Sequence, residues 1–400
     1  MTKSQKIEEV LTRGVEKIYP SKNALKNLLT KNKKIKLYQG FDPSMPNLHL
    51  GNLVGILKLK QFQDLGHKVI FLVGDFTGMI GDPTGKIEGA RPQLTHQQVL
   101  KNAKSYKKQA GRILNFSGKN PAKIQYNSKW LSNLSVDKLA GLMRHLTYSQ
   151  IIKRDMFQKR IEKGKDILLS EFFYPFMQAY DSVYMNVDLE IGGSDQMFNM
   201  LVGRQLMKKL KNKEKFVLTT KLLIDKQGEK IGKTTGNALF LNAKPDQMFG
   251  AIMNFPDEVI ILGFELLTFI PLQQINDYKN LLNKKNINPM ILKKELGFEI
   301  VKLNYGKQKA QKAQMEFERI FKEKKLPTKI PEIIFRKEIL NILDILLISG
   351  LAQSKSQGKR LILQGGVKID NEIQKDCKKQ IKIKKGMILQ IGKRKFIKVI

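Results

Sequence analysis

The stretch from Tyr38 to Asn52 has the residue types of a ligand-binding loop. It contains two glycines, two prolines, an aspartate (Asp42) and a histidine (His49), and an amphipathic run begins at its end. Free backbone N–H groups at the start of a helix attract anions, so His49 and Gly51 are placed where an anionic ligand can bind. The stretch therefore predicts an anion-binding loop at a helix N-terminus.

A second glycine-rich stretch is basic. Residues 222–224 predict a short strand, and the loop after it has three glycines within nine residues, with Lys230, Lys233 and Thr234 among them. Two lysines three residues apart mean little in a chain this basic, so the motif counts only in its context. Flexible backbone, lysines and hydroxyls together are typical of a loop that contacts phosphate groups.

Three polar residues, Tyr174, Gln178 and Asp181, are spaced so that they share one face of a predicted helix. Their neighbours on that face are aromatic and apolar, and buried polar groups need hydrogen-bond partners. Two interpretations stay open at this point: the three residues bind a ligand, or they form a structural hydrogen-bond network.

The turn Gly192-Gly193-Ser194 follows a predicted strand at residues 187–191, and Asp195 and Gln196 open the next helix. A carboxylate at this position can bind a ribose hydroxyl, and the glycines allow a nucleotide to approach closely. The alternative is a plain strand-to-helix turn in which Ser194 or Asp195 caps the helix.

Asp82 lies in a glycine-rich stretch, Gly74 to Lys86, that is not a phosphate-binding P-loop. The first glycine of that motif would fall on Ile80, and Ile87 occupies its Ser/Thr position. We expect a rim at a strand end, with Asp82 directed toward the ligand of the first loop. The alternative is a turn aspartate that caps a helix.

The elements that must position these residues are alternating strands and helices. Residues 34–37 and 68–73 predict strands with a helix between them, and such a βαβ unit implies a parallel sheet. In parallel sheets, ligands bind beyond the carboxyl ends of the strands. We further expect helix over residues 5–32, helices around one strand (123–126) within residues 93–170, and helices over residues 244–325.

Composition limits the class of protein. The 400 residues suffice for two or three domains, and 72 Lys+Arg against 36 Asp+Glu give a net charge of +36. This excess favours a polyanionic partner such as nucleic acid, although genomic bias toward lysine codons is an alternative. The single cysteine, Cys377, excludes an intramolecular disulfide framework and a cysteine-built zinc site. No apolar run is long enough to span a membrane, and no signal peptide is recognisable, so we expect a cytoplasmic protein.

Basic charge is concentrated at the C-terminus. Residues 354–400 contain 14 Lys+Arg and three acidic residues. Residues 338–349 and 354–363 predict two short helices, residues 365–371 a hairpin, and residues 386–400 further strands. A small basic module of this kind suits an RNA duplex or stem-loop that is bound through its phosphates and its shape.

Together these stretches resemble the bacterial tyrosyl-tRNA synthetases, which are class I aminoacyl-tRNA synthetases. The segment His49-Leu50-Gly51-Asn52 resembles their His-Ile-Gly-His signature, and residues 230–234 resemble their Lys-Met-Ser-Lys-Ser signature. Residues 174–181 resemble the tyrosine-binding helix, residues 192–196 the adenosine-binding turn, and residues 354–371 the S4-type RNA-binding domain. The match spans essentially the whole chain.

The resemblance implies an α/β fold in three parts. These are a Rossmann-like parallel-sheet catalytic domain (1–222), the second signature loop with a helical domain on the anticodon side (223–335), and a small C-terminal α+β S4-like RNA-binding domain (336–400). It implies that ATP activates L-tyrosine to tyrosyl-adenylate and that tyrosine then moves to the 3′ end of tRNA(Tyr). It also implies a homodimer, Mg²⁺ that enters with ATP, and no zinc or other protein-bound metal.

Four sets of site residues follow from the matched motifs. The catalytic set is His49, Asn52, Lys230, Lys233 and Thr234. The tyrosine-binding set is Tyr38, Asp82, Tyr174, Gln178, Asp181 and Gln196. The ATP-binding set is Gly40, Asp42, His49, Gly51, Asn52, Gly193, Asp195, Lys230 and Lys233. The RNA-binding set is Lys355, Lys359, Arg360 and Lys368.

The chain departs from the family pattern at one position. Asn52 stands where the signature has its second histidine, and because asparagine donates and accepts hydrogen bonds, we expect activity to survive.

A tryptophanyl-tRNA synthetase would share the class signatures, but Tyr38 with Asp181 and the S4-like tail count against it. A small nucleotidyltransferase needs no basic tail, and a non-catalytic RNA-binding paralogue needs none of the signature residues.

Overall fold

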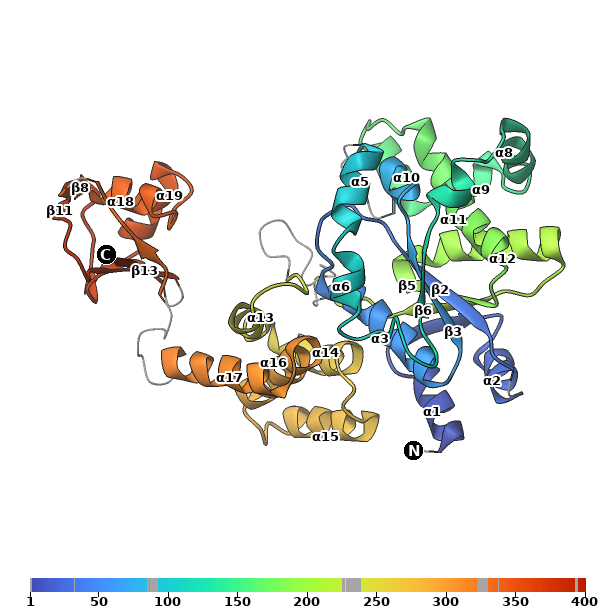
Figure 1. The fold of residues 1–400 in the computed structure, drawn as a ribbon, viewed down its shortest axis with the longest axis horizontal. Helices are drawn as coiled ribbons and strands as arrows, with labels where there is room; N and C mark the ends of the chain where they lie inside the picture. Colours follow the sequence, from blue (N-terminus) through green and yellow to red (C-terminus); the bar gives the residue numbers. More distant parts are fainter. Residues whose placement is uncertain are drawn as a thin grey trace. The chain divides into compact units, whose positions relative to one another are not determined.

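Six strands form a sheet in the first part of the chain (Figure 1). They are β1 (Val15–Tyr19), β2 (Lys36–Phe41), β3 (Lys68–Val73), β4 (Lys123–Tyr126), β5 (Leu189–Gly193) and β6 (Phe216–Thr220). The strand order is β1-β6-β5-β2-β3-β4, and every neighbouring pair is parallel except β1 and β6. The expected parallel sheet of an α/β protein is therefore confirmed.

This computed structural model describes residues 2–31, 33–84, 86, 93–224, 227, 239–321, 330–336, 338–392 and 395–400. The chain divides into two units, Met1–Ala310 and Gln311–Ile400, which are described separately below. The division falls within α17 (Lys307–Phe321). The expected domain limits at 222/223 and 335/336 remain predictions.

The first βαβ unit consists of β2, α3 (Leu50–Asp64) and β3. Residues 69–73 of β3 are buried without interruption, as befits a parallel strand that is covered on both faces. Parallel strands end at the same edge of a sheet, so the loops that follow β2, β3 and β5 share one edge. The predicted site residues of the sheet lie in these loops and in the helices next to them.

The expectation of helix over residues 5–32 is wrong in its middle. The structure has α1 (Lys3–Val10), then strand β1, then α2 (Lys22–Thr30). Gly14, at a φ of +60°, turns the chain after α1, and Val15 and Ile18 then pair with β6. The spacing of Val15 and Ile18 also fits a helix, but strand pairing decides their conformation. The strand expected at residues 222–224 is likewise wrong, because the strand of this region, β6, ends at Thr220.

Between β3 and β5 the chain is helical around β4, as expected. The helices are α4 (Thr77–Ile80), α5 (His96–Ala103), α6 (Tyr106–Ala110), α7 (Ser128–Leu131), α8 (Val136–Met143), α9 (Tyr148–Ile152), α10 (Asp155–Glu162) and α11 (Leu169–Met185). Near the N-terminus of α11 a buried ion pair joins Arg160 to Glu171, with 2.7 Å between Nη1 and Oε1. The helix α12 (Met197–Lys211) packs beside α11.

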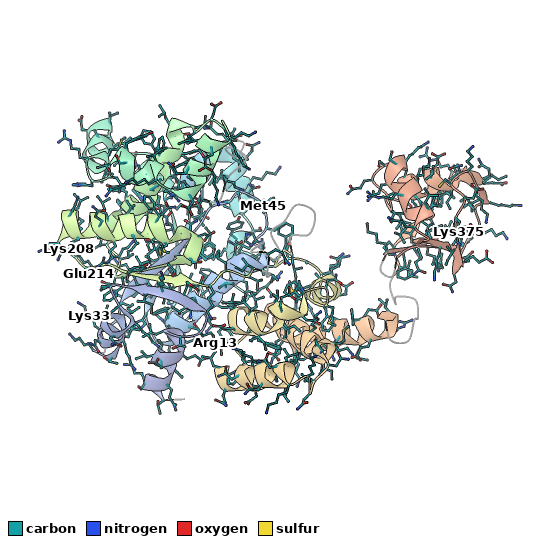
Figure 2. All side chains as sticks on the ribbon, turned by 180° about the vertical axis from the view of Figure 1, so that it is seen from behind. Arg13, Lys33, Met45, Lys208, Glu214 and Lys375 are labelled. Carbon is teal, nitrogen blue, oxygen red and sulfur yellow. The ribbon has the colours of Figure 1, made fainter. Side chains whose placement is uncertain are left out.

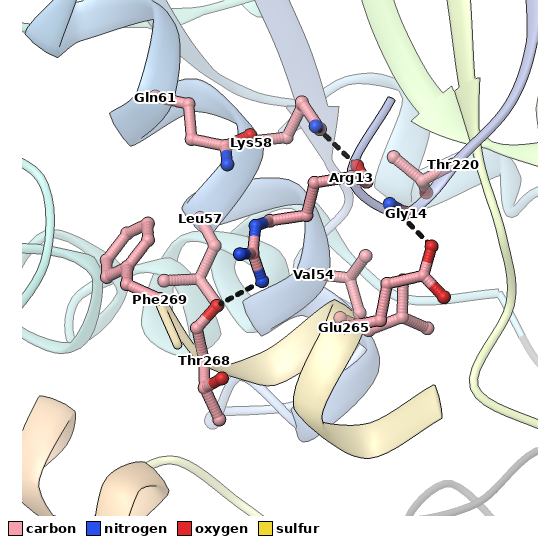
Figure 3. Close-up of a pocket in the computed structure, with 11 residues that line it drawn as sticks. Arg13, Gly14, Val54, Leu57, Lys58, Gln61, Thr220, Glu265, Thr268 and Phe269 are labelled. Atoms are coloured by element: carbon pink, nitrogen blue, oxygen red, sulfur yellow. Dashed lines mark hydrogen bonds between the residues drawn. The ribbon is translucent and has the colours of Figure 1, made fainter. Parts of the chain in front are cut away.

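The expected helices over residues 244–325 are confirmed in the described residues. They are α13 (Pro245–Ile252), α14 (Ile260–Leu267), α15 (Leu272–Asn283), α16 (Pro289–Tyr305) and α17. Figure 3 shows where α14 meets the turn after α1. Gly14 N donates to Glu265 Oε1 at 3.0 Å, and Lys58 Nζ donates to the carbonyls of Val10 and Arg13. Burial lowers the pKa of Lys58 to about 7.

The second unit has the expected hairpin and second helix, but the helix expected over residues 338–349 is wrong at its start, because residues 339–341 form a strand that pairs with β11 (Gln380–Lys382). The helices are α18 (Ile342–Ile348) and α19 (Lys355–Leu363), and the hairpin is β9 (Val367–Ile369) with β10 (Glu372–Ile373). Asp370 and Asn371, at φ of 50° and 70°, form its turn, as expected where both central residues have positive φ. The remaining strands are β7 (Glu332–Ile333), β8 (Ile339–Asn341), β11 (Gln380–Lys382), β12 (Ile388–Ile391) and β13 (Lys395–Val399). Over the described parts of the whole chain, no helix is both long and apolar enough to cross a membrane.

Candidate active site

The first signature lies at the start of α3. His49 is the residue before the helix, and its backbone N–H donates to Asn52 Oδ1 at 3.0 Å. Asn52 thus closes the first helical turn, which is the capping role that its side chain can perform. A Cβ at Gly51 would lie 2.8 Å from His49 Cε1. Glycine is therefore required there if the imidazole is to lie against the helix start.

The segment around His49 is paired with the segment that follows the second signature. Leu50 N donates to Leu239 O at 3.0 Å, and Leu241 N donates to Leu48 O at 2.8 Å. Lys230, Lys233 and Thr234 of the catalytic and ATP-binding sets lie outside the described residues. The described chain resumes at Leu239, and residues 239 and 241 are hydrogen-bonded to the two neighbours of His49 in the sequence.

The loop between β2 and α3 is held by α5 and α6. Tyr106 Oη donates to Met45 O at 2.9 Å, and Asn102 Nδ2 donates to Pro43 O at 2.9 Å. Met45 is labelled in Figure 2. A loop with two prolines and these anchors is rigid enough to present His49 to a ligand.

Asp42 joins this loop to the helix α11. Its Oδ1 accepts a hydrogen bond from Thr77 Oγ1 at 2.8 Å, and its Oδ2 accepts one from Tyr174 Oη at 2.8 Å. A Cβ at Gly74 would lie 2.0 Å from Asp42 Oδ1, so only glycine fits there. Burial raises the pKa of Tyr174, and the nearby Asp42 adds to the rise, so the phenol keeps its proton and donates.

Asp82 and Gln196, both assigned to the tyrosine-binding set, contact each other. Gln196 Nε2 donates to Asp82 Oδ2 at 2.6 Å, and Thr84 N donates to Asp82 Oδ1 at 2.9 Å. Asp82 is thus a turn aspartate and is also directed toward the turn after β5, but among the described helices none is capped by it, so that part of the alternative interpretation is wrong. Arg154 was missed by sequence reasoning: its Nη2 donates to Thr84 Oγ1 at 3.0 Å and its guanidinium lies over Phe198.

Tyr38 and Asp181 are buried in neighbouring positions. The Tyr38 hydroxyl lies 2.9 Å from Ser182 Oγ, and the Asp181 carboxylate accepts from Trp130 Nε1 at 2.7 Å and from Asn127 Nδ2 at 3.2 Å. Burial raises the pKa of Asp181 and outweighs the hydrogen bonds from Trp130 and Asn127, which act in the opposite direction. Burial also raises the pKa of Tyr38, and the nearby Glu190 and Asp181 raise it further.

The side chain of Gln178 is hydrogen-bonded to a buried carboxylate. Its Nε2 donates to Glu190 Oε1 at 3.0 Å, whereas its Oε1 is buried without a hydrogen-bond partner. An orphaned buried acceptor is unfavourable unless a ligand supplies the donor. Gln178 therefore belongs to a structural network, and the ligand-binding interpretation of this helix face stays a prediction.

The remaining ATP-binding candidates lie at the strand ends. Gly40 is the penultimate residue of β2, and Gly193 is the last residue of β5. A Cβ at Gly193 would lie 2.6 Å from Asp195 Oδ1, so glycine allows the Asp195 carboxylate to fold back over the strand end. The structure thus brings Asp42, Tyr174, Asp82 and Gln196 into two direct contacts at the sheet edge.

The RNA-binding candidates all belong to the second unit. Lys355, Lys359 and Arg360 are exposed on α19, and Lys368 is partly exposed on β9. Lys355 pairs with Asp344 at 2.8 Å. Among the residues that the structure describes, no cluster of three or more His, Cys, Asp or Glu could hold a metal ion.

Loops at the carboxyl ends of parallel strands and His49 at a helix N-terminus form the arrangement that the resemblance to class I aminoacyl-tRNA synthetases implies. Residues 30–322 match the family of tRNA synthetases class I (W and Y), and residues 342–386 match the S4 domain. The chain belongs to this synthetase family and is an aminoacyl-tRNA ligase.

Full-length relatives place the chain in the tyrosyl branch of that family. The tyrosine–tRNA ligase of Thermotoga maritima is 39% identical over 400 residues, which cover 100% of this chain and 98% of the relative. That of Dehalococcoides mccartyi (strain CBDB1) is 39% identical over 396 residues, which cover 98% of each chain.

Solved structures support the fold. A C-terminally truncated mitochondrial tyrosyl-tRNA synthetase of Aspergillus nidulans has a TM-score of 0.65 at 22% identity, covering 79% of this chain and 94% of that chain. The tyrosyl-tRNA synthetase of Archaeoglobus fulgidus, solved in complex with L-tyrosine, has a TM-score of 0.60 at 20% identity, covering 78% of this chain and 100% of that chain.

Proposed function

We propose that this protein joins L-tyrosine to tRNA(Tyr) in two steps. ATP first activates tyrosine to tyrosyl-adenylate with release of pyrophosphate, and the tyrosyl group then moves to the 3′ end of the tRNA. The observation that supports the proposal is the burial of Tyr38, on the strand β2 that leads into the first signature, and of Asp181, which the residue after β4, Asn127, contacts.

Recognition of the amino acid follows from the polar groups around this pair. Tyr38 and Asp181 hydrogen-bond the phenol of the substrate, and Asp82, Tyr174 and Gln178 hold its ammonium, with Gln196 positioning Asp82. The orphaned Gln178 Oε1 is a suitable acceptor for an ammonium proton. Phenylalanine would leave Tyr38 and Asp181 without a partner in a dry pocket, and an unpaired buried polar group is costly.

Activation needs charge stabilisation more than proton transfer. The tyrosine carboxylate is already a nucleophile, so no general base is required, and negative charge on the phosphates has to be stabilised. His49 and Asn52 at the start of α3 and the loop with Lys230, Lys233 and Thr234 supply this stabilisation. The remaining ATP contacts come from the strand ends and the first helix start: Gly40, Asp42, Gly51, Gly193 and Asp195.

Mg²⁺ enters as a companion of ATP. Among the described residues there is no cluster of three or more His, Cys, Asp or Glu that could hold a metal ion. The phosphate oxygens of ATP are good ligands for Mg²⁺, and the ion would neutralise part of their charge.

The second unit binds the tRNA, and two copies of the chain form a dimer in the cytoplasm. Lys355, Lys359, Arg360 and Lys368 contact RNA phosphates. Exposed apolar side chains of the first unit, such as Val136, Tyr148 and Leu169, provide area for the dimer contact. We retain the three-domain division of the chain at 222/223 and 335/336.

Pyrophosphate exchange into ATP with each of the twenty amino acids tests the proposal. Exchange with tyrosine alone supports it, and charging of tRNA(Tyr) by the same preparation completes the test. Exchange with tryptophan would indicate the other branch of the family. No exchange with any amino acid would indicate a non-catalytic RNA-binding protein.

A further inference from the structure

The residues that follow the second signature in the sequence, 239–243, lie against the first signature. Phe240 forms an antiparallel bridge with His49. Leu241 N donates to Leu48 O at 2.8 Å, and Leu241 is fully buried. We call residues 239–243 the bridge segment. A two-stranded contact this short is marginally stable by itself, so its geometry depends on the other parts of the chain that hold it.

Two side chains from distant parts of the sequence bind the carbonyls of the bridge segment. Arg112, which lies two residues after α6, donates from Nη1 to Leu241 O. Tyr305 is the last residue of α16, and its Oη lies 2.5 Å from Ala243 O and 3.1 Å from Leu241 O. Because a phenol has one proton to give, we assign it to the nearer carbonyl, that of Ala243. Leu241 O and Ala243 O thus have one donor each.

Arg112 and Tyr305 also hold each other. The Cζ atom of Arg112 lies 4.5 Å from the centre of the Tyr305 ring, and both side chains are partly buried. A guanidinium over an aromatic ring is attracted by the negative charge of the ring face. Because this contact restricts the rotamers of both side chains, each donor is directed at its carbonyl before any substrate binds.

The end of α6 holds the other strand of the bridge as well. Gln109 is buried there, and its Oε1 accepts from Leu48 N at 2.9 Å. Gln109 and Arg112 are three residues apart, so one short piece of chain contacts both strands of the bridge. The position of His49 relative to the bridge segment therefore depends on the end of α6, and Tyr305 adds a contact from α16.

We propose that Arg112 and Tyr305 are positioning residues for adenylate formation and that they act on the ATP phosphates through His49. This inference rests on the proposed role of His49 and goes further, because it assigns rate enhancement to two residues that touch no substrate. A group that stabilises charge in the transition state has to be placed accurately, since a small displacement lowers the rate more than it weakens the binding of the substrates.

The test is pyrophosphate exchange with Arg112→Ala and with Tyr305→Phe, the second of which removes only the hydroxyl group. We expect kcat to fall about tenfold in Arg112→Ala and several-fold in Tyr305→Phe, while the KM for tyrosine stays within about twofold of wild type. The two effects separate because, among the described residues, neither side chain is hydrogen-bonded to a member of the tyrosine-binding set. Wild-type kcat in both variants overturns the proposal.

Two matched controls remove the same chemical groups elsewhere in the first unit. Arg204→Ala, on α12, breaks an ion pair with Glu214, and Tyr278→Phe, on α15, removes a hydrogen bond to Glu295. Both should keep the wild-type kcat and the wild-type KM for tyrosine. Losses of kcat in the controls as large as those in the test variants would overturn the proposal, because the effect would then not depend on the bridge segment.

A double-mutant cycle with His49→Ala separates positioning from a merely structural role. If Arg112 acts through His49, its removal matters little once the imidazole is gone, so the kcat of the double variant should equal that of His49→Ala within about twofold. Losses that multiply overturn the proposal. Tyr305→Phe is carried through the same cycle with the same expectation, and it keeps the test decisive if Arg112→Ala folds poorly.

Failure of this inference is separable from failure of the proposed function. If His49→Ala alone leaves kcat unchanged, His49 has no catalytic role, and both its place in the proposed site and this inference fall. If His49→Ala lowers kcat while the losses from Arg112→Ala and Tyr305→Phe are absent or multiply with it, the proposed site stands and only the positioning role falls.

Discussion

The hydroxyl of Tyr174 donates a 2.8 Å hydrogen bond to Asp42. Tyr174 comes from the helix that carries the tyrosine-binding motif, and Asp42 comes from the loop assigned to ATP. The two predicted subsites therefore share a side-chain contact, as two substrates that react with each other require.

Tyr174→Phe should weaken the binding of both substrates, tyrosine and ATP. The substitution removes the hydrogen bond to Asp42 and a group near the substrate ammonium, so we expect KM to rise several-fold for tyrosine and for ATP. Pyrophosphate exchange at varied concentrations of each substrate measures this. Tyr184→Phe, on the exposed side of the same helix, is the control and should leave both values unchanged. A rise for tyrosine alone would show that Asp42 does not serve the ATP subsite.

Gly51→Ala should displace His49. The new Cβ would lie 2.8 Å from His49 Cε1, so the imidazole or the helix start would have to move. We expect kcat for adenylate formation to fall by ten- to a hundredfold, while the melting temperature changes little because alanine favours the helix. Gly141→Ala is the matched control, since a Cβ at Gly141 in α8 meets open space. Full activity of Gly51→Ala would show that the position of the imidazole is unimportant.

Substitutions of Asn52 test whether the departure from the family signature at this position affects stability and activity. Asn52→Ala removes the acceptor for His49 N, and loss of a helix cap costs about 1 kcal/mol of stability. We expect a lower denaturant midpoint and a lower kcat. Asn52→His restores the family residue and should retain activity within a few-fold. An inactive histidine variant would mean that the asparagine has a role that the family residue does not fill.

His67 gives the fold an acid-sensitive element. Burial lowers its pKa to about 4, from an ordinary value near 6.5, and its Nδ1 accepts from Ile35 N at 3.4 Å. At a pH between these two pKa values, His67 is protonated in the unfolded chain and neutral in the folded chain. The free energy of unfolding is therefore highest above pH ~6.5, and it decreases by at most about 3 kcal/mol as the pH falls toward 4. His67→Gln should flatten this slope in urea titrations at several pH values, and an identical slope would contradict the account.

Most of the candidate site could be predicted from the sequence because its motifs are local. Tyr174, Gln178 and Asp181 share a helix face by spacing alone, and the Asp370-Asn371 turn follows from residue type. Other features depend on partners far along the chain. The spacing of Val15 and Ile18 fits a helix, and only their pairing with β6 shows that they form a strand. Lys215 has no sequence signal that distinguishes it from a surface lysine, but it is buried in an ion pair with Glu190. Arg154 has no local signal either.

The most direct measurement is a crystal structure of the enzyme with a non-hydrolysable tyrosyl-adenylate analogue. We predict the phenol oxygen within hydrogen-bond distance, about 3 Å, of both Tyr38 Oη and an Asp181 carboxylate oxygen, with the adenosine beside Gly193 and Asp195. A tyrosyl ring bound elsewhere, with Tyr38 still bonded only to Ser182, would contradict the central claim that these two buried residues read the amino acid.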